Sequence, residues 1–527
     1  MFLHGNNLTP VSFRWAANLD QNSTRGLSLT RAKPTAEKED SALYNVTHRG
    51  KLNVVVFMID GFRAELGSYM DTRTEQPWLF DGIQTPNLDH LANCSVRFNR
   101  AFAQFGICAV SRSSIMIGRR PDSLHMSNMD TWFRETAGEN IITLPQYFRQ
   151  HGYTTIGRGK VFCPARIAFG NDMGKSWDDL WTIPKEILNS SWTVTEKDGK
   201  EPLWDQRLLE QVKISLTTHS DVFNKTQKPF FMFVGFKRPH FPLKVPKKYF
   251  DMYPLDNVTI ASNSYVPHNR AGPSWHVSPE LMYFQDMKQY AENWRVNSTL
   301  PPDVAKQVRR AYYASISYID DIAGKMLAHL DGLGLRENTV VMLTADHGVH
   351  LGENGLWGKM SNFEASTRVL LLIHIPGMTN PGVTNRMVEM VDIFPTVIEA
   401  AGLPKVSACP ERPDGIALCT EGVSLLPLVK NPNHEPWKNR VFWQARSQSY
   451  KGILTGYSMR NNEFRYSEWI ESTHGQPREW PKPHASELYD KIRDPGENYN
   501  LANDTSYNDV IATLSAQVHD GWRAART

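Results

Sequence analysis

The 527 residues of the chain are 41% hydrophobic and 21% charged, which is typical of a folded globular protein rather than a disordered or collagen-like one. The formal net charge of +3, without a long Lys/Arg run, predicts no nucleic-acid partner. No apolar stretch approaches the roughly 18 residues that a spanning helix needs, so we expect no membrane span.

The first 50 residues are polar and rich in Ser, Thr and Asn, and they hold no apolar signal-peptide core. We expect residues 1–50 to form a poorly ordered N-terminal extension. The missing core predicts either that the protein stays inside the cell or that its true start lies upstream.

Short apolar runs alternate with helical patterns from residue 52 to about residue 405. The unbroken, β-branched or aromatic runs predict strands that are buried on both faces, at residues 54–59, 230–236, 339–344 and 370–375. Apolar residues with a period near 3.6 predict a long helix over about 303–330. Strands that alternate with helices indicate parallel pairing in an α/β sandwich.

The pattern changes after about residue 405, where a Pro- and Gly-rich stretch leads into aromatic-rich runs. Residues 440–445, 450–457 and 464–470 predict antiparallel strands, and residues 508–526 predict a final helix. We therefore expect a main domain over 51–430 with a large mixed, mostly parallel sheet. A smaller C-terminal α+β subdomain with an antiparallel sheet should follow over 431–527.

The cysteines and the glycosylation motifs bear on the compartment. The chain has five cysteines, so at least one thiol lies outside any intramolecular disulfide. Cys409 and Cys419 lie in the Pro/Gly-rich loop and would close a short ring, and we expect them to form a disulfide in an oxidising compartment. Nine Asn-X-Ser/Thr acceptors occur where composition predicts about four. They favour a secreted or lysosomal protein: Asn7, Asn22, Asn45, Asn93, Asn189, Asn224, Asn257, Asn297 and Asn503.

Polar side chains follow the predicted parallel strands and a further strand-like run at 153–157, and ligands in such sheets gather beyond the carboxyl ends of the strands. Taken singly, each of these residues has a structural explanation, since an Asp often caps a helix and a Lys or Arg in a loop is usually solvated. Their joint placement predicts a site for a hard metal ion and an oxyanion. The residues are Asp60, Arg158, Lys160, Lys237, Arg238, His240, Asp346, His347 and Lys359.

A further motif, Cys108-Ala109-Val110-Ser111-Arg112, precedes a helix that we expect over 113–117 and that ends at Gly118. A helix N-terminus favours anions, and Arg112 would share a helix face with Cys108 because it lies four residues further on. A buried structural cysteine is the alternative reading of Cys108.

This motif, followed by Gly-Arg-Arg-Pro at 118–121, resembles the signature of the sulfatases of the alkaline phosphatase superfamily. Segments 345–359 and 487–502 are similar to sulfatases broadly. Five segments resemble the iduronate-2-sulfatase subgroup, and they cover residues 101–114, 118–123, 144–162, 235–249 and 312–324. The resemblance runs from about residue 50 to the C-terminus and implies the alkaline-phosphatase-like sandwich.

The resemblance implies that a formylglycine-generating enzyme oxidises Cys108 to an aldehyde. One hydroxyl of the hydrated aldehyde attacks sulfur, and the second expels sulfate. One calcium ion would be held by Asp60, Asp346, His347 and the modified Cys108. The implied substrate is a sulfated glycosaminoglycan, with release of the 2-O-sulfate of iduronate from dermatan or heparan sulfate.

The resemblance also assigns roles to four cationic side chains. Arg112 would steady the hydrated aldehyde, while Lys160 and Lys359 would neutralise sulfate charge in the transition state. His240 would protonate the leaving oxygen, on which charge grows as the S–O bond breaks.

Four positions depart from the family pattern. Gly61 stands where a second Asp is usual, and Val110 stands where the modification signature has Pro. Cys163 replaces an active-site His of the subgroup, and Val349 replaces a Trp that would line the sugar pocket. These departures bear on metal binding, on conversion of Cys108 and on specificity.

Two other functions are open at this point. Asp60-Gly61-Phe62-Arg63 is similar to the opening motif of nucleotide phosphodiesterases of the same superfamily, but these need a Thr or Ser nucleophile and two zinc ions held by several His and Asp residues. A catalytically impaired, glycan-binding sulfatase relative would keep Lys160, His240 and Lys359 and lose turnover. The retained Cys108 favours an active sulfatase.

Overall fold

The computed structural model describes residues 51–163, 169–182, 192–195, 202–277, 279–447, 454–471 and 480–526. The predicted N-terminal extension lies outside these residues, as do four of the glycosylation acceptors, Asn7, Asn22, Asn45 and Asn189.

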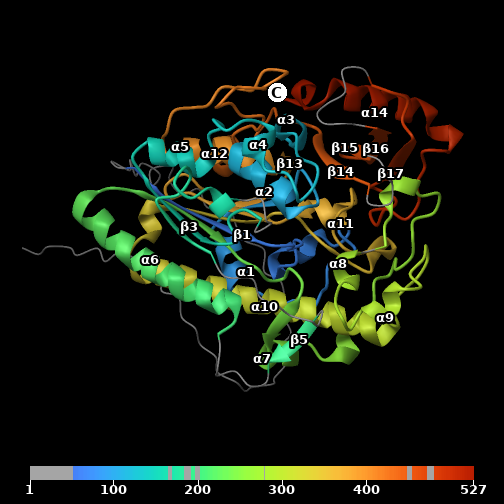
Figure 1. Ribbon diagram of the computed structural model, residues 1–527, viewed down its shortest axis with the longest axis horizontal. Coiled ribbons are helices and arrows are strands. Elements are labelled where there is room, and N and C mark those ends of the chain that lie inside the picture. The colour runs from blue at the N-terminus through green and yellow to red at the C-terminus, as the bar shows by residue number, and fades with distance from the viewer. Residues whose placement is uncertain are drawn as a thin grey trace, which may run out of the picture.

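A nine-stranded sheet runs through the centre of the molecule (Figure 1). Its strand order is β11–β2–β12–β8–β1–β6–β3–β4, with β13 paired to β2. The middle strands β8, β1, β6 and β3 are parallel, while β12 runs antiparallel to both of its neighbours. This confirms the mixed, mostly parallel sheet. The strands are β1 (Asn53–Ile59), β2 (Val96–Phe102), β3 (Thr154–Gly159), β4 (Asp179–Trp181), β6 (Phe230–Gly235), β8 (Thr339–Ala345), β11 (Arg368–Val369), β12 (Leu371–His374) and β13 (Gly382–Glu389).

Helices cover both faces of this sheet, which explains why every residue of β1, β6 and β8 is buried. In Figure 1, α6 (Trp204–Thr226) and α10 (Pro302–Gly332) lie along one face. The other face is covered by α2 (Cys108–Ile117), α5 (Leu144–Gln150) and α12 (Ile393–Ala400). Helix α10 matches the long helix predicted from the 3.6 period. None of the helices in the described part of the chain is long and apolar enough to cross a membrane.

The remaining helices are short and lie in the connections. They are α1 (Pro86–Asn93), α3 (Pro121–Leu124), α4 (Phe133–Thr136), α7 (Lys247–Asp251), α8 (Pro279–Met282), α9 (Lys288–Ala291), α11 (Glu364–Thr367) and α13 (Leu426–Lys430). Two-stranded pairings in these connections are β5 (Trp192–Thr195) with β7 (Leu243–Pro246), and β9 (His350–Leu351) with β10 (Trp357–Gly358).

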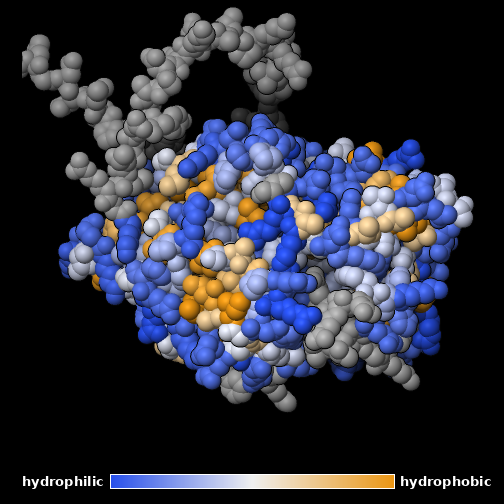
Figure 2. Space-filling model, turned by 90° about the horizontal axis from the view of Figure 1, so that it is seen from above, coloured by the Kyte–Doolittle hydropathy of each residue, from blue (hydrophilic) through white to orange (hydrophobic). Residues whose placement is uncertain are grey.

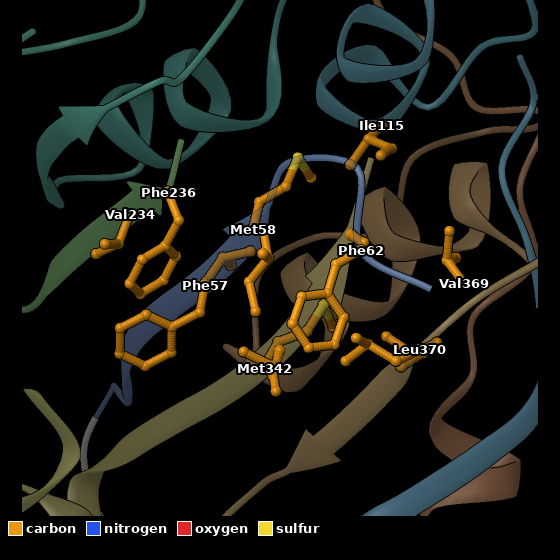
Figure 3. Packing of buried hydrophobic residues seen from close by; sticks show 14 of the residues in the cluster. Phe57, Met58, Phe62, Ile115, Val234, Phe236, Met342, Val369 and Leu370 are labelled. Atoms are coloured by element: carbon orange, nitrogen blue, oxygen red, sulfur yellow. The ribbon is translucent and has the colours of Figure 1, made fainter. Parts of the chain in front are cut away.

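The hydrophobic core lies between the sheet and its helices. Figure 3 shows Phe57 and Met58 of β1 packed among side chains from neighbouring elements, including Phe236 and Met342. Phe62, three residues after β1, is also fully buried in this cluster. The loop that follows β1 is therefore anchored on both sides of Asp60. The face seen in Figure 2 is largely hydrophilic, with one apolar patch near its middle and smaller apolar groups elsewhere.

The C-terminal part forms a second, antiparallel sheet in the order β14–β15–β16–β17. It confirms the predicted α+β character, although the sequence patterns did not predict β17. Helix α14 (Asn508–Asp520) packs against this sheet. The predicted final helix over 508–526 is wrong beyond Asp520, because Gly521 adopts φ 71° and ψ −172° and breaks it. The strands are β14 (Val441–Arg446), β15 (Leu454–Arg460), β16 (Phe464–Glu471) and β17 (Ala485–Asp490); residues 450–453 of the predicted second strand lie outside the described residues.

The carboxyl ends of the parallel strands meet at one edge of the main sheet. Backbone hydrogen bonds continue past the strand ends, since the amide of Lys160 donates to the carbonyl of Gly235 at 2.8 Å. A Cβ at Gly235 would lie 1.8 Å from the Lys160 carbonyl oxygen, so only glycine permits this approach. The segments that follow β1, β3, β6 and β8 are thereby held close together.

Candidate active site

The structure brings the eight predicted catalytic and metal-binding residues into one connected cluster at this edge. Asp60 follows β1, Lys160 follows β3, His240 follows β6, and Asp346 with His347 follows β8. Hydrogen bonds and ion pairs link Asp60, Lys160, Asp346 and His347 with the others, which are Cys108, Arg112 and Lys359. His240 joins them through Glu280, which contacts both His240 and Lys359. Arg158 is not part of the cluster, because its Nε donates to Ser215 and its guanidinium pairs with Asp179. Arg238 is turned instead toward the carbonyl oxygen of Lys244.

Cys108 lies at the centre of the cluster and is fully buried. Its Sγ is 3.3 Å from His347 Nε2, 3.3 Å from Lys359 Nζ and 3.7 Å from Asp60 Oδ1. Helix α2 begins at Cys108 itself and not at residue 113 as predicted, because the backbone leaves its extended conformation after Ile107. The sulfur atom therefore lies at a helix N-terminus, which favours negative charge.

The buried thiol of Cys163 lies close enough to Cys108 to affect its ionisation. The Cys163 thiol, together with Lys160, Lys359 and His347, outweighs burial and lowers the pKa of Cys108 well below its usual value. The pKa of Cys163 is raised by its interaction with Cys108 and by burial. Because Cys163 stands where the subgroup has a His, a second thiol lies near the thiol of Cys108.

Asp346 is held by several donors. Its Oδ1 accepts from the backbone amides of Gly61 and His347, both at 3.0 Å. Its Oδ2 accepts from Arg112 Nε at 2.8 Å. Burial alone would raise the pKa of Asp346, but His347 and Arg112 outweigh it and lower the pKa to about 2. The ammonium group of Lys160 forms an ion pair with the carboxylate of Asp60.

Four of these residues form a candidate metal-binding group, since ligand atoms of Asp60, Cys108, Asp346 and His347 all lie within 4.8 Å of one another. His347 Nδ1 lies 2.9 Å from the carbonyl oxygen of Gly348. A carbonyl only accepts, so Nδ1 carries the hydrogen, and in the neutral ring Nε2 is free to bind a cation. Two carboxylates, one imidazole and one thiol are ligand types that bind divalent metal ions, so the group fits such an ion.

Among the described residues, the buried Nη2 of Arg112 has no hydrogen-bond partner. Together with the ammonium groups of Lys160 and Lys359, it leaves hydrogen-bonding capacity for an anion beside Cys108. The cluster can therefore hold a cation on its carboxylate side and a tetrahedral oxyanion on its lysine side.

Glu280 also belongs to this cluster, although it follows no strand end. Its Oε1 lies 2.9 Å from Lys359 Nζ and 3.1 Å from His240 Nε2. Glu280 is carried by α8, a four-residue helix in the long connection before α10. Neither periodicity nor a strand end marks this position in the sequence.

The departures from the family pattern also have defined environments. Gly61 adopts φ 67°, and a Cβ there would lie 3.7 Å from His347 Cε1, an ordinary contact. Val110 is fully buried in the first turn of α2, and Val349 is buried after β8.

The predicted disulfide partners are joined: the sulfur atoms of Cys409 and Cys419 lie 2.08 Å apart.

A family model described as Sulfatase matches residues 52–403, and one described as N-sulphoglucosamine sulphohydrolase, C-terminal, matches residues 352–523. Iduronate 2-sulfatase of Mus musculus is 30% identical, over 90% of this chain and 95% of the relative. Iduronate 2-sulfatase of Homo sapiens is 31% identical, over 88% of this chain and 93% of the relative.

Among solved structures, the phosphonate monoester hydrolase from Silicibacter pomeroyi has a TM-score of 0.66 at 19% sequence identity, covering 90% of this chain and 96% of that one. This likeness shows a shared fold. The family match covers more than half of the chain, and the iduronate 2-sulfatase relatives span most of it. The chain therefore belongs to the sulfatase family and is a sulfuric ester hydrolase similar to iduronate 2-sulfatase.

Proposed function

We propose that this sulfatase removes the 2-O-sulfate of iduronate in dermatan or heparan sulfate, and that it uses a formylglycine made from Cys108 and one calcium ion. The observation that supports this best is the position of Cys108. Its buried sulfur lies at a helix N-terminus, against both His347 and Lys359. The 30% and 31% identity to iduronate 2-sulfatases supports the substrate class.

Calcium would be held by Asp60, Asp346, His347 and the modified Cys108. The present thiol suits a softer ion such as zinc, whereas an oxygen at position 108 would make the set harder and better suited to calcium. When bound, the ion supplies a positive charge that orients the nucleophile and polarises a sulfate oxygen.

The chain's own cations act on the sulfate ester. Lys160 and Lys359 neutralise the charge on the sulfate oxygens, and Arg112 fixes Asp346 while its free Nη2 donates to the nucleophile's oxygen. His240 holds a proton for the departing sugar oxygen. Burial of these groups strengthens each interaction, because water no longer screens it.

Introducing a carboxylate by Gly61→Asp is expected to tighten calcium binding by about tenfold or more, since one charged ligand is added. The Cβ has room, and Asp tolerates the positive φ at a cost of about 1 kcal/mol. Calorimetric titration with calcium measures the affinity. Gly61→Ala carries the same backbone strain without a ligand, so equal affinities for the two variants would contradict the metal assignment.

Conversion of Cys108 is tested by mass spectrometry of the peptide across Cys108, after expression with a formylglycine-generating enzyme. We expect a loss of about 18 Da, which the covalent change from thiol to aldehyde requires. The converted protein is then expected to release sulfate from a 2-sulfated iduronide. Release of sulfate only from simple aryl sulfates would refute the proposed iduronate 2-sulfate substrate.

A glycan-binding protein without turnover is the second candidate, and the loss of a carboxylate at Gly61 and the thiol pair of Cys108 and Cys163 favour it. It becomes the better proposal if Cys108 stays a thiol under conditions that convert a control sulfatase. In that case the site would hold a sulfated sugar through Lys160, His240 and Lys359.

We further propose a lysosomal or secreted location, and maturation by the formylglycine-generating enzyme in the secretory pathway. Two observations support an oxidising, glycosylating compartment. Cys409 and Cys419 form a disulfide. The acceptor asparagines within the described residues are all exposed: Asn93, Asn224, Asn257, Asn297 and Asn503.

A further inference from the structure

Glu280 places a negative charge inside the cationic half of the site. Its side chain is 13% exposed, and one carboxylate oxygen contacts both Lys359 Nζ at 2.9 Å and His240 Nε2 at 3.1 Å. Lys359 in turn lies 3.3 Å from the sulfur of Cys108. Glu280 is therefore joined to the nucleophile position through a single side chain.

The two ring nitrogens of His240 both face oxygen acceptors. Nδ1 lies 2.6 Å from the carbonyl oxygen of Phe241, and Nε2 lies 3.1 Å from the Glu280 carboxylate. A neutral imidazole would direct one lone pair at an oxygen, so this arrangement requires a hydrogen on both nitrogens. The geometry is that of an imidazolium.

The charged groups that act on His240 are Lys359, Asp60, Glu280 and Lys160. Burial and the two lysines lower the pKa of His240, but the two carboxylates outweigh them and raise the pKa to about 9. A raised pKa means that the proton is present at neutral pH and is lost only as the pH rises through about 9. Without Glu280, only Asp60 would remain to offset the effect of the two lysines on the pKa of His240.

We propose that Glu280 is a positioning residue for the leaving-group proton, holding His240 doubly protonated with its Nε2 hydrogen on the side of the site where Glu280 and Lys359 lie. The proposal rests on the proposed sulfate ester hydrolysis. As the S–O bond breaks, its electron pair stays on the sugar oxygen. The Nε2 proton leaves its contact with Glu280 and moves to that oxygen, and His240 becomes neutral until water returns a proton. Glu280 stays ionised throughout, and Lys359 remains paired.

Glu280→Gln keeps the size of the side chain and removes its charge. We expect kcat for a sulfated sugar, whose alcohol is a poor leaving group, to fall about 10²-fold. Turnover of 4-nitrophenyl sulfate should change less than about threefold, because its leaving group departs without a proton. The alkaline limb of the sugar sulfate profile should move to lower pH. Glu292→Gln, an exposed change of the same type on the same connection, is the control.

Two results would overturn the proposal. Equal losses on both substrates would show that Glu280 only supports Lys359 or the fold. A lower KM for both substrates, with kcat unchanged, would show that the carboxylate instead occupies the place of the substrate's oxygen.

A second measurement needs no turnover. NMR titration of labelled histidine, with the His240 signal identified by His240→Gln, should show that His240 loses its proton at a pH about one unit or more lower in Glu280→Gln than in the wild type. An unchanged titration would refute the proposal. If the wild type released no sulfate from any ester, the proposed function would fail, while this titration would still decide whether Glu280 holds the proton.

Discussion

Cys108→Ser is expected to abolish steady-state sulfate release, with a fall on the order of 10⁴-fold or more. Serine keeps one hydroxyl at this buried helix N-terminus and can accept a sulfuryl group. It lacks the second hydroxyl by which the hydrated aldehyde would expel sulfate, so the group should stay attached. Incubation with substrate should add about 80 Da to the peptide that spans residue 108, which mass spectrometry would detect.

The matched control is Cys94→Ser, the same substitution at a free cysteine at the end of α1. It should leave turnover unchanged. Full activity of Cys108→Ser would place the nucleophile elsewhere, and activity without conversion of Cys108 would remove the need for the aldehyde.

Arg112→Met is expected to lower the free energy of unfolding of the metal-free protein by about 3–5 kcal/mol. Arg112 is fully buried, and its loss removes the cation 2.8 Å from the Asp346 carboxylate and leaves only His347, 3.7 Å away. Asp60, 4.0 Å from Nη2, would keep Lys160. Calcium should reduce the difference from the wild type, because the ion replaces the missing positive charge and binds only the folded state. Urea unfolding with and without calcium measures both effects.

The lowered pKa of Asp346 also predicts how the difference in the free energy of unfolding between variant and wild type changes with pH. The lowered pKa of Asp346 means that its ion pair stabilises the wild type above the ordinary Asp pKa, and that this stability is lost as the pH falls toward about 2. The variant and the wild type should therefore converge in acid. Arg149→Met, which breaks a half-exposed pair with Asp178, should cost at most about 1 kcal/mol. A similar small cost for Arg112→Met would contradict a buried ion pair.

Much of the fold and of the site could be predicted from local patterns. Unbroken apolar runs indicated β1, β6 and β8, because a strand covered by helices on both faces has no polar side to show. Asp60, Asp346 and His347 could then be placed together, since they follow parallel strands and such strands end at one edge of a sheet. The cysteine motif and the long segments similar to sulfatases indicated the family.

Other features depend on contacts between residues far apart in the chain, which no local pattern records. Helix α2 begins at Cys108, where the backbone changes from extended to helical, and Arg158 lies outside the site because its guanidinium binds Ser215 and Asp179. Glu280 enters the site from a four-residue helix that tertiary packing alone positions.

The pairing of Cys163 with Cys108 likewise follows from the approach of two chain segments that meet only in the folded protein. Periodicity and composition therefore determine where the main strands and helices form and that the central strands are parallel, because these follow from burial of apolar side chains along the chain. The protonation of His240 and the charge around Cys108 depend on which side chains lie within a few ångströms, and only the packing of distant elements decides this.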